Sequence, residues 1–97
     1  MPTYISLVKY TDQGIRSVKD SPKRAEAFRA LCEKLGGRVK DLYWTMGRYD
    51  IVATVEAPDD VTINAILYSI ASLGNVRTET LRASTAQEMN QVIAKMA

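Results

Sequence analysis

Hydrophobic and polar positions repeat with two different periods along the chain. Four stretches are rich in β-branched and aromatic residues and alternate at roughly every second position, which predicts β-strands. Three other stretches repeat apolar residues at every third or fourth position, which predicts helices with one apolar side. The predicted strands are residues 3–10, 39–45, 51–57 and 76–83, and the predicted helices begin near Ser21-Pro22, Pro58-Asp59 and Thr85.

Residues at the helix ends support these boundaries. Ser21 followed by Pro22 suits an N-cap and a first helical residue, and Gly36 permits a left-handed stop. Thr85-Ala86-Gln87-Glu88 matches a capping box, in which the side chains at both ends of the motif bond each other's backbone N–H groups. The last strand carries Arg77, Glu79 and Arg82 and is therefore predicted at a sheet edge.

A turn at Gly47-Arg48 joins the second and third predicted strands, because glycine suits a two-residue loop that needs a positive φ. Cross-strand partners share a face, so this loop gives the hairpin two unlike faces. The face that we expect helices to cover carries Leu42, Trp44, Met46, Tyr49, Ile51, Ala53 and Val55. The other, mixed face carries Val39, Asp41, Tyr43, Thr45, Asp50, Val52, Thr54 and Glu56, joined by parity in the first strand by Tyr4, Ser6, Val8 and Tyr10.

The order of elements predicts an α+β fold, the ferredoxin-like βαββαβ arrangement with an antiparallel four-stranded sheet and an extra C-terminal helix. We expect one domain over residues 1–97, with a core at 1–84 and the terminal helix at 85–97. The mixed face holds too much apolar and aromatic surface for a monomer, so a second sheet should cover it. Self-association as a homodimer or a higher oligomer is the expected partner interaction.

Composition excludes several classes of chemistry. The chain has no histidine, which removes the usual general base at neutral pH and the commonest ligand of zinc and haem, and Cys32 is its only cysteine. We therefore predict no cofactor and no metal, and Cys32 should be a buried core residue. Basic residues gather before Tyr49, but acidic residues are interspersed and the net charge is only +2, so nucleic-acid binding is not expected. Without a spanning segment or a signal peptide pattern, no membrane role and a cytoplasmic location are expected.

Four motifs taken together resemble the GYD domain family, which is named for a central Gly-x-Tyr-Asp. They are Tyr10-Thr11-Asp12-Gln13-Gly14-Ile15, Gly36-Gly37, Gly47-Arg48-Tyr49-Asp50, and the segment from Gly74 to Ala83. The resemblance runs to about Thr85. It implies the dimeric α/β-barrel group, in which two ferredoxin-like sheets face each other, and it carries no settled biochemical activity.

The candidate site residues lie around the turn and the mixed face. Asp50 is the candidate catalytic residue, as a ligand anchor or a proton acceptor, because burial without a cation would raise its pKa; the alternative is that it bonds backbone amides near the turn. Tyr49 is either a ligand contact or a core residue with an exposed hydroxyl. The predicted ligand-binding residues are Tyr4, Ser6, Tyr43, Tyr49, Asp50 and Arg82.

Three functions stay open from the sequence. The first is a non-catalytic oligomer that binds a small organic molecule in the barrel or sheet cleft. The second is a cofactor-free enzyme that acts on a phenolic or acidic organic substrate, with Asp50 as base and Tyr43 or Tyr49 as orienting group. The third is a structural assembly module, because so much apolar surface needs a partner.

Overall fold

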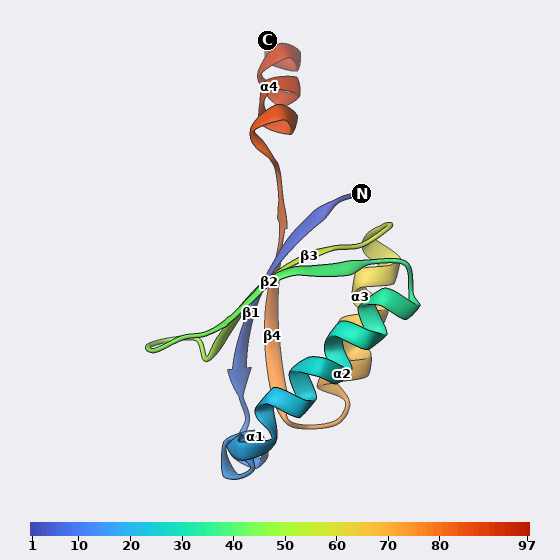
Figure 1. Ribbon diagram of the computed structural model, residues 1–97. Helices are drawn as coiled ribbons and strands as arrows, with labels where there is room; N and C mark the ends of the chain where they lie inside the picture. The colour runs from blue at the N-terminus through green and yellow to red at the C-terminus, as the bar shows by residue number, and fades with distance from the viewer.

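The computed structural model describes residues Met1–Ala97, and the predicted strands and helices are all present (Figure 1). A short helix and a turn of 3-10 helix also precede the first long helix. The elements are β1 (Thr3–Tyr10), α1 (Asp12–Arg16), η1 (Val18–Asp20), α2 (Ser21–Lys34), β2 (Arg38–Trp44), β3 (Ile51–Glu56), α3 (Asp60–Ala71), β4 (Val76–Ala83) and α4 (Ala86–Lys95).

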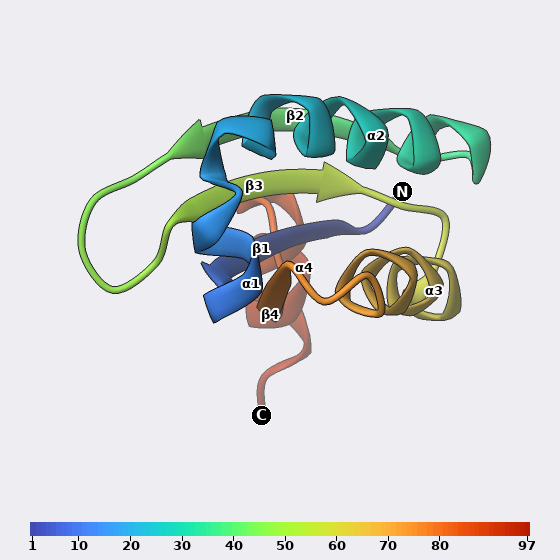
Figure 2. The same cartoon turned by 90° about the horizontal axis from the view of Figure 1, so that it is seen from below.

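The four strands form one antiparallel sheet in the order β2-β3-β1-β4, so β4 lies at an edge as predicted. The helices α2 and α3 both lie on one side of this sheet, as Figures 1 and 2 show together. This arrangement confirms the ferredoxin-like α+β fold. We call the face under α2 and α3 the covered face and the opposite one the open face.

The core fills the space between the covered face and the two helices. Cys32 of α2, Val55 of β3 and Ile66 of α3 are each 0% exposed and belong to one core cluster, so both helices and the sheet contribute to the core. Burial of an aliphatic side chain of this size contributes roughly 1.5–3 kcal/mol. The predicted burial of Cys32 is confirmed, and burial raises the pKa of its thiol to about 11.

The register of β1 corrects one prediction. Tyr4 pairs with Val55 and Ser6 with Ala53, so Tyr4, Ser6 and Val8 lie on the covered face and not on the mixed face. Tyr10 lies on the covered face as well, because its hydroxyl bonds Ser21 of α2. Tyr4 is only 3% exposed and Ser6 only 2%. Both hydroxyls can be buried because each has a partner: Tyr4 donates to the Asp60 carboxylate, and Ser6 bonds Thr80 at 2.9 Å.

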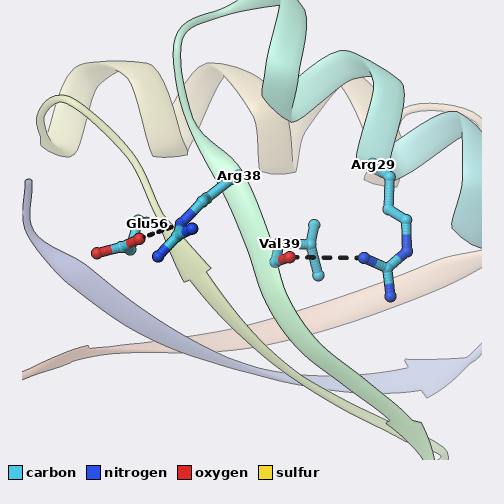
Figure 3. Close-up of polar contacts among 4 residues, drawn as sticks. All are labelled: Arg29, Arg38, Val39 and Glu56. Carbon is cyan, nitrogen blue, oxygen red and sulfur yellow. Dashed lines mark hydrogen bonds and ion pairs between the residues drawn. The ribbon is translucent and has the colours of Figure 1, made fainter.

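A bulge in β2 corrects a second placement. The register of β2 against β3 shifts between Val39 and Asp41, and Val39 pairs with Val55. Val39 therefore packs against the core and does not lie on the open face. Figure 3 shows the neighbouring contacts: Arg29 of α2 donates to the Val39 carbonyl oxygen at 3.5 Å, while Arg38 pairs with Glu56 across the strands.

Two motifs that are distant in the sequence meet where β1 ends and β4 begins. Thr11 donates through its amide to the Asn75 carbonyl oxygen at 3.1 Å and through its hydroxyl to the Gly74 carbonyl oxygen at 2.6 Å. The Gln13 amide group reaches the Leu73 carbonyl oxygen at 3.1 Å. Gly14 packs so closely that a Cβ there would lie 1.9 Å from the Asn75 oxygen, so no side chain fits. These contacts join α1 to the loop between α3 and β4.

The terminal helix α4 begins with the predicted capping box. Thr85 accepts a hydrogen bond from the Glu88 amide at 3.1 Å, and the Glu88 carboxylate accepts one from the Thr85 amide at 3.0 Å. Figure 1 shows α4 projecting beyond the end of β4, away from the two covering helices. Its predicted apolar side is exposed in this chain, with Met89, Val92, Ile93 and Met96 all 48% exposed or more. None of the helices is both long and apolar enough to cross a membrane.

Candidate functional site

The open face combines an apolar centre with a charged border. Pairing places alternate residues of each strand on it, because Ile5 faces Leu81 and Leu7 faces Val52 across neighbouring strands. Tyr43 of β2 faces Val52 from the other side and is 63% exposed, while Leu81 is 49% exposed. The apolar centre of this face has no cover within a single chain. The open face consists of Thr3, Ile5, Leu7, Lys9, Arg38, Asp41, Tyr43, Val52, Thr54, Glu56, Arg77, Glu79, Leu81 and Ala83.

The charges on the open face are unevenly matched. Arg38 and Glu56 form an ion pair, which lowers the pKa of the Glu56 carboxyl. Lys9 and Arg77 are direct cross-strand neighbours, yet neither takes part in any of the ion pairs of the structure. Like charges that face each other across strands destabilise a sheet unless something offsets them. Glu79 lies on the same side and offsets part of this charge, so the β1–β4 side of the open face carries a small excess of positive charge.

The turn between β2 and β3 is longer than the predicted two-residue loop. The last backbone hydrogen bond of the hairpin joins the Thr45 amide to the Asp50 carbonyl oxygen at 2.9 Å, which leaves 46–49 as the connection. Gly47 has φ +103°, so the predicted positive φ is confirmed. Met46 does not reach the core, because it lies in this loop and is 98% exposed.

Tyr49 points away from the core, contrary to its predicted placement. Its hydroxyl donates to a carboxylate oxygen of Glu79 on the open face at 2.8 Å, and this hydrogen bond raises the pKa of the phenol. The bond connects the turn to β4 over the end of the open face. Trp44, by contrast, lies on the predicted side: its indole N–H donates to the Ser21 hydroxyl of α2 at 2.9 Å.

Asp50 is held by the backbone of β1. Its carboxylate accepts a hydrogen bond from the Tyr10 amide at 2.8 Å, and its own amide donates to the Val8 carbonyl oxygen at 2.8 Å. Asp50 lines neither the pocket between α2 and α3 nor the pocket beside α3 and β4. These contacts agree with the alternative that Asp50 bonds backbone amides near the turn, and they leave its catalytic role as an expectation without a geometric basis.

Tyr4 and Arg82 meet at the edge of the covered face. The Arg82 guanidinium carbon lies 5.8 Å from the centre of the Tyr4 ring. An Arg82 nitrogen also lies 3.9 Å from the Asp60 carboxylate, which accepts the hydrogen bond from the Tyr4 hydroxyl. Burial, followed by the bond to Asp60, raises the pKa of Tyr4 to about 12. The cluster ties β1, α3 and β4 together.

The structure therefore distributes the predicted ligand residues over three places. Tyr4 and Arg82 touch each other, and Ser6 is buried nearby on the same face. Tyr43 lies on the open face, whereas Tyr49 and Asp50 belong to the turn. Their shared role in binding one ligand stays a prediction. Sequence reasoning missed Asp60 and Glu79, whose pairing with Tyr4 and Tyr49 had no local signal because each pair is far apart in the chain.

Comparison with known proteins identifies relatives along nearly the whole chain. The model of the GYD domain family matches residues 4–93. A protein of Thermus thermophilus, the glutamine synthetase and cystathionine β-lyase binding protein, is 38% identical over 84 residues, which cover 86% of this chain and 88% of that protein. The resemblance predicted from the four motifs is thus supported by an independent match.

Solved structures share the fold. The crystal structure of a Thermus thermophilus protein superposes with a TM-score of 0.57 at 30% identity and covers 89% of this chain and 96% of that one. A feast or famine regulatory protein of Mycobacterium tuberculosis, complexed with L-methionine, gives a TM-score of 0.67 at 19% identity. The match covers 89% of this chain and 52% of that regulator, so this chain corresponds to about half of it. At this identity the likeness concerns the fold alone.

Proposed function

The chain belongs to the GYD domain family, and from this premise we propose that it is a self-associating binding protein whose paired subunits bind partner enzymes. The relative from Thermus thermophilus, at 38% identity, is named for binding glutamine synthetase and cystathionine β-lyase. We extend this class of partner, enzymes of amino-acid metabolism, to the present chain. The observation that carries the proposal is the uncovered apolar centre of the open face.

Apolar burial favours pairing of two open faces. Side chains such as Tyr43 and Leu81 are 63% and 49% exposed in the single chain, and a standard interface covers ~800 Å² on each partner. A second copy is the simplest cover, because most soluble oligomers are homo-oligomers with a two-fold axis. In such a pair each face must complement itself.

The charge pattern supports self-complementarity. The open face carries two basic residues without an ion pair, Lys9 and Arg77, on its β1–β4 side, where Glu79 also lies, and it carries Asp41, likewise without an ion pair, on β2. A two-fold axis that runs parallel to the strands between two such faces brings opposite sides together, so the basic side of one copy would meet the acidic side of the other. The proposal therefore needs no third component to offset the excess positive charge.

A second candidate is binding of a small organic molecule between the paired faces. Tyr43 favours it, since its phenol stands on the open face without a hydrogen-bond partner in the chain and would point into the space between two sheets. This candidate and enzyme binding are compatible. The candidate assigns no role to Asp50 as a base, because that carboxylate already bonds the Tyr10 amide.

Sedimentation equilibrium tests the pairing. We expect the wild-type chain to be a dimer at micromolar concentration and Leu7→Asp to be a folded monomer with an association constant at least a hundredfold lower, because the new carboxylate would be buried in the interface. The control is Val61→Asp on the outer side of α3, which is 79% exposed and should leave the dimer intact. A wild-type monomer at this concentration would overturn the proposal.

Biolayer interferometry with purified glutamine synthetase and cystathionine β-lyase from the source organism tests the partner class. Wild-type protein and Val61→Asp should bind at least one of the two enzymes, and Leu7→Asp should bind at least tenfold more weakly if the pair is the binding unit. Equal binding by the monomer would separate enzyme binding from self-association. Binding of neither enzyme by a confirmed dimer would remove the partner class and leave the small-molecule candidate.

A further inference from the structure

The two edges of the sheet are protected to different degrees. β2 forms one edge and is interrupted by the bulge between Val39 and Asp41. β4 forms the other edge and pairs with β1 in one continuous register from Val76 to Ala83, without a proline or a glycine. A bulge hinders the pairing of a further strand, whereas a long regular edge leaves a row of backbone N–H and C=O groups free to pair. β4 is therefore the edge that can accept another strand.

The charges of β4 alternate in sign on the open face. Arg77 and Glu79 are both exposed and lie two positions apart, so their side chains stand on the same side of the strand. Neither residue belongs to an ion pair of the structure. Across β1, Arg77 faces Lys9 and Glu79 faces Leu7, so neither charge has an opposite charge directly across from it. The Tyr49 hydroxyl donates to one carboxylate oxygen of Glu79 and leaves the other oxygen free.

A two-fold axis limits how two β4 strands can pair. The axis stands perpendicular to the sheet, makes the strands antiparallel and keeps paired residues on the same face, so successive registers shift each partner by two positions. With the axis at Thr78, Arg77 of each copy faces Glu79 of the other. An axis at Glu79 or at Arg77 brings two like charges together, and an axis at Thr80 gives no charge pair. Opposite charges across strands stabilise a sheet and like charges destabilise it, so charge selects the axis at Thr78.

The covered side of the β4 edge leaves room for a second copy. Thr78 and Thr80 line an open groove there, beside Tyr68 of α3, whose side chain is 75% exposed. The terminal helix α4 projects beyond the end of β4 and does not lie along this edge (Figure 1). A second β4 brings another α3 to the same side of the enlarged sheet, because the axis is perpendicular to the sheet. The groove and Tyr68 are then partly covered.

We propose that β4 pairs antiparallel with β4 of a second copy around an axis at Thr78, so that two four-stranded sheets become one continuous sheet. The paired segment runs from Val76 to Thr80 in each copy. Arg77 then lies between Lys9 of its own chain and the partner's Glu79, which offsets the repulsion between the two basic residues. This edge is separate from the open face. When both surfaces pair, each chain has two neighbours and assemblies larger than a dimer form.

Disulfide trapping tests the register. Thr78→Cys places a thiol on the proposed axis, and Cα atoms directly opposite each other in antiparallel strands lie about 4.5–5.5 Å apart, within the reach of a disulfide. Mild oxidation should convert Thr78→Cys to a covalent dimer at least tenfold faster than Thr80→Cys, whose thiol faces Val76 and lies far from its own copy. The wild-type chain should not be trapped, because Cys32 is buried. No trapping of Thr78→Cys, or equally fast trapping of Thr80→Cys, overturns the proposal.

Charge exchange in the Thr78→Cys background tests the pairing of Arg77 with Glu79. Arg77→Glu places two carboxylates opposite each other at two positions and should slow trapping at least tenfold. Adding Glu79→Arg restores opposite charges in reversed order and should restore most of the rate. The control Lys23→Glu, exposed on α2, makes the same change of charge away from β4 and should leave the rate unchanged.

An unchanged rate in Arg77→Glu, or no recovery when Glu79→Arg is added, would overturn the pairing of the two charges. Trapping at Thr78 does not require the open face, so it can succeed when Leu7→Asp and the wild type are both monomers at micromolar concentration. A stable open-face dimer without trapping would leave the proposed function in place and remove the edge pairing alone. The two proposals therefore fail on different observations.

Discussion

The two faces of the sheet are buried to different extents within one chain. On the covered face, Ala53 and Val55 are 2% and 0% exposed, and even the polar Ser6 is buried with its hydroxyl bonded. On the open face, Tyr43 and Leu81 remain 63% and 49% exposed. Each of the four strands contributes residues to both faces, so β-propensity does not distinguish the faces. The difference lies in what covers each face.

The contrast shows how the chain divides its stabilising interactions. Burial under α2 and α3 stabilises the fold of a single chain, because apolar area leaves water as the core forms. The open face contributes to stability only when another surface removes it from water, so its contribution must depend on protein concentration. Three further experiments use this distinction.

The largest effect should come from truncating the core. Ile66→Ala removes a side chain that is 0% exposed and should lower the free energy of unfolding by about 2–5 kcal/mol at every protein concentration. The matched variant Leu81→Ala, on the open face, should change the unfolding free energy by less than about 1 kcal/mol in dilute solution and by more at high concentration. Urea unfolding at two protein concentrations measures both. If Leu81→Ala lowered the free energy of unfolding equally at both protein concentrations, the open face would not be an interface between two copies of the chain.

Alkaline unfolding should depend on Tyr4, which is buried on the covered face. The pKa of Tyr4 is raised to about 12 in the fold, above its ordinary value of 10.0, so the folded state holds this proton more tightly than the unfolded state. The resulting stability is complete below pH 10 and is lost as the pH rises through the folded pKa. Tyr4→Phe should therefore flatten the decline of stability between pH 10 and 12, because phenylalanine has no proton to lose. Thermal melts of the wild type and of Tyr4→Phe over this range measure the effect, and an equally steep decline in the variant would contradict the assignment.

The smallest effect concerns α4, which belongs to neither face. Thr85→Ala removes the hydroxyl that accepts the Glu88 amide but leaves the bond from the Thr85 backbone to the Glu88 carboxylate, and it should destabilise the helix by about 1 kcal/mol. Because α4 projects from the body, amide exchange should quicken within 86–95 while global unfolding is unchanged. Ser84→Ala, next to the cap but outside it, is the control. An equal loss in global stability would mean that α4 packs on the rest of the protein.

The parts of the fold set by local interactions could be predicted from sequence. Leu42 pairs with Ala53 and Trp44 with Ile51 as expected, because the turn that sets this register lies only a few residues away. Helix ends followed from Gly36 and Gly74, both at φ +88°, since glycine adopts this conformation readily. The resemblance to the GYD domain family, which the family model supports, rested on motifs of the same local kind.

Placements that depend on distant partners could not be predicted. Pairing with β3 and β4 determines which residues of β1 face the helices. Both sides of β1 carry apolar residues, so the alternation within β1 alone could not show which side is covered. The Tyr4–Asp60 and Ser6–Thr80 bonds span 56 and 74 residues, and without them a buried hydroxyl is not expected. The bulge after Val39 likewise shifts the register without a marker such as glycine. The candidate site inherited these errors, because Tyr4 and Ser6 were assigned to the wrong face.

The junction of Thr11 and Gly14 with Gly74 and Asn75 has a consequence for the inheritance of this fold. The two segments lie far apart in the sequence, yet the backbone of one occupies the space that a side chain of the other would need. A substitution at Gly14 is tolerable only with a different path for the chain at Asn75. We therefore expect related sequences to change at these two segments together, although the segments are far apart in the sequence.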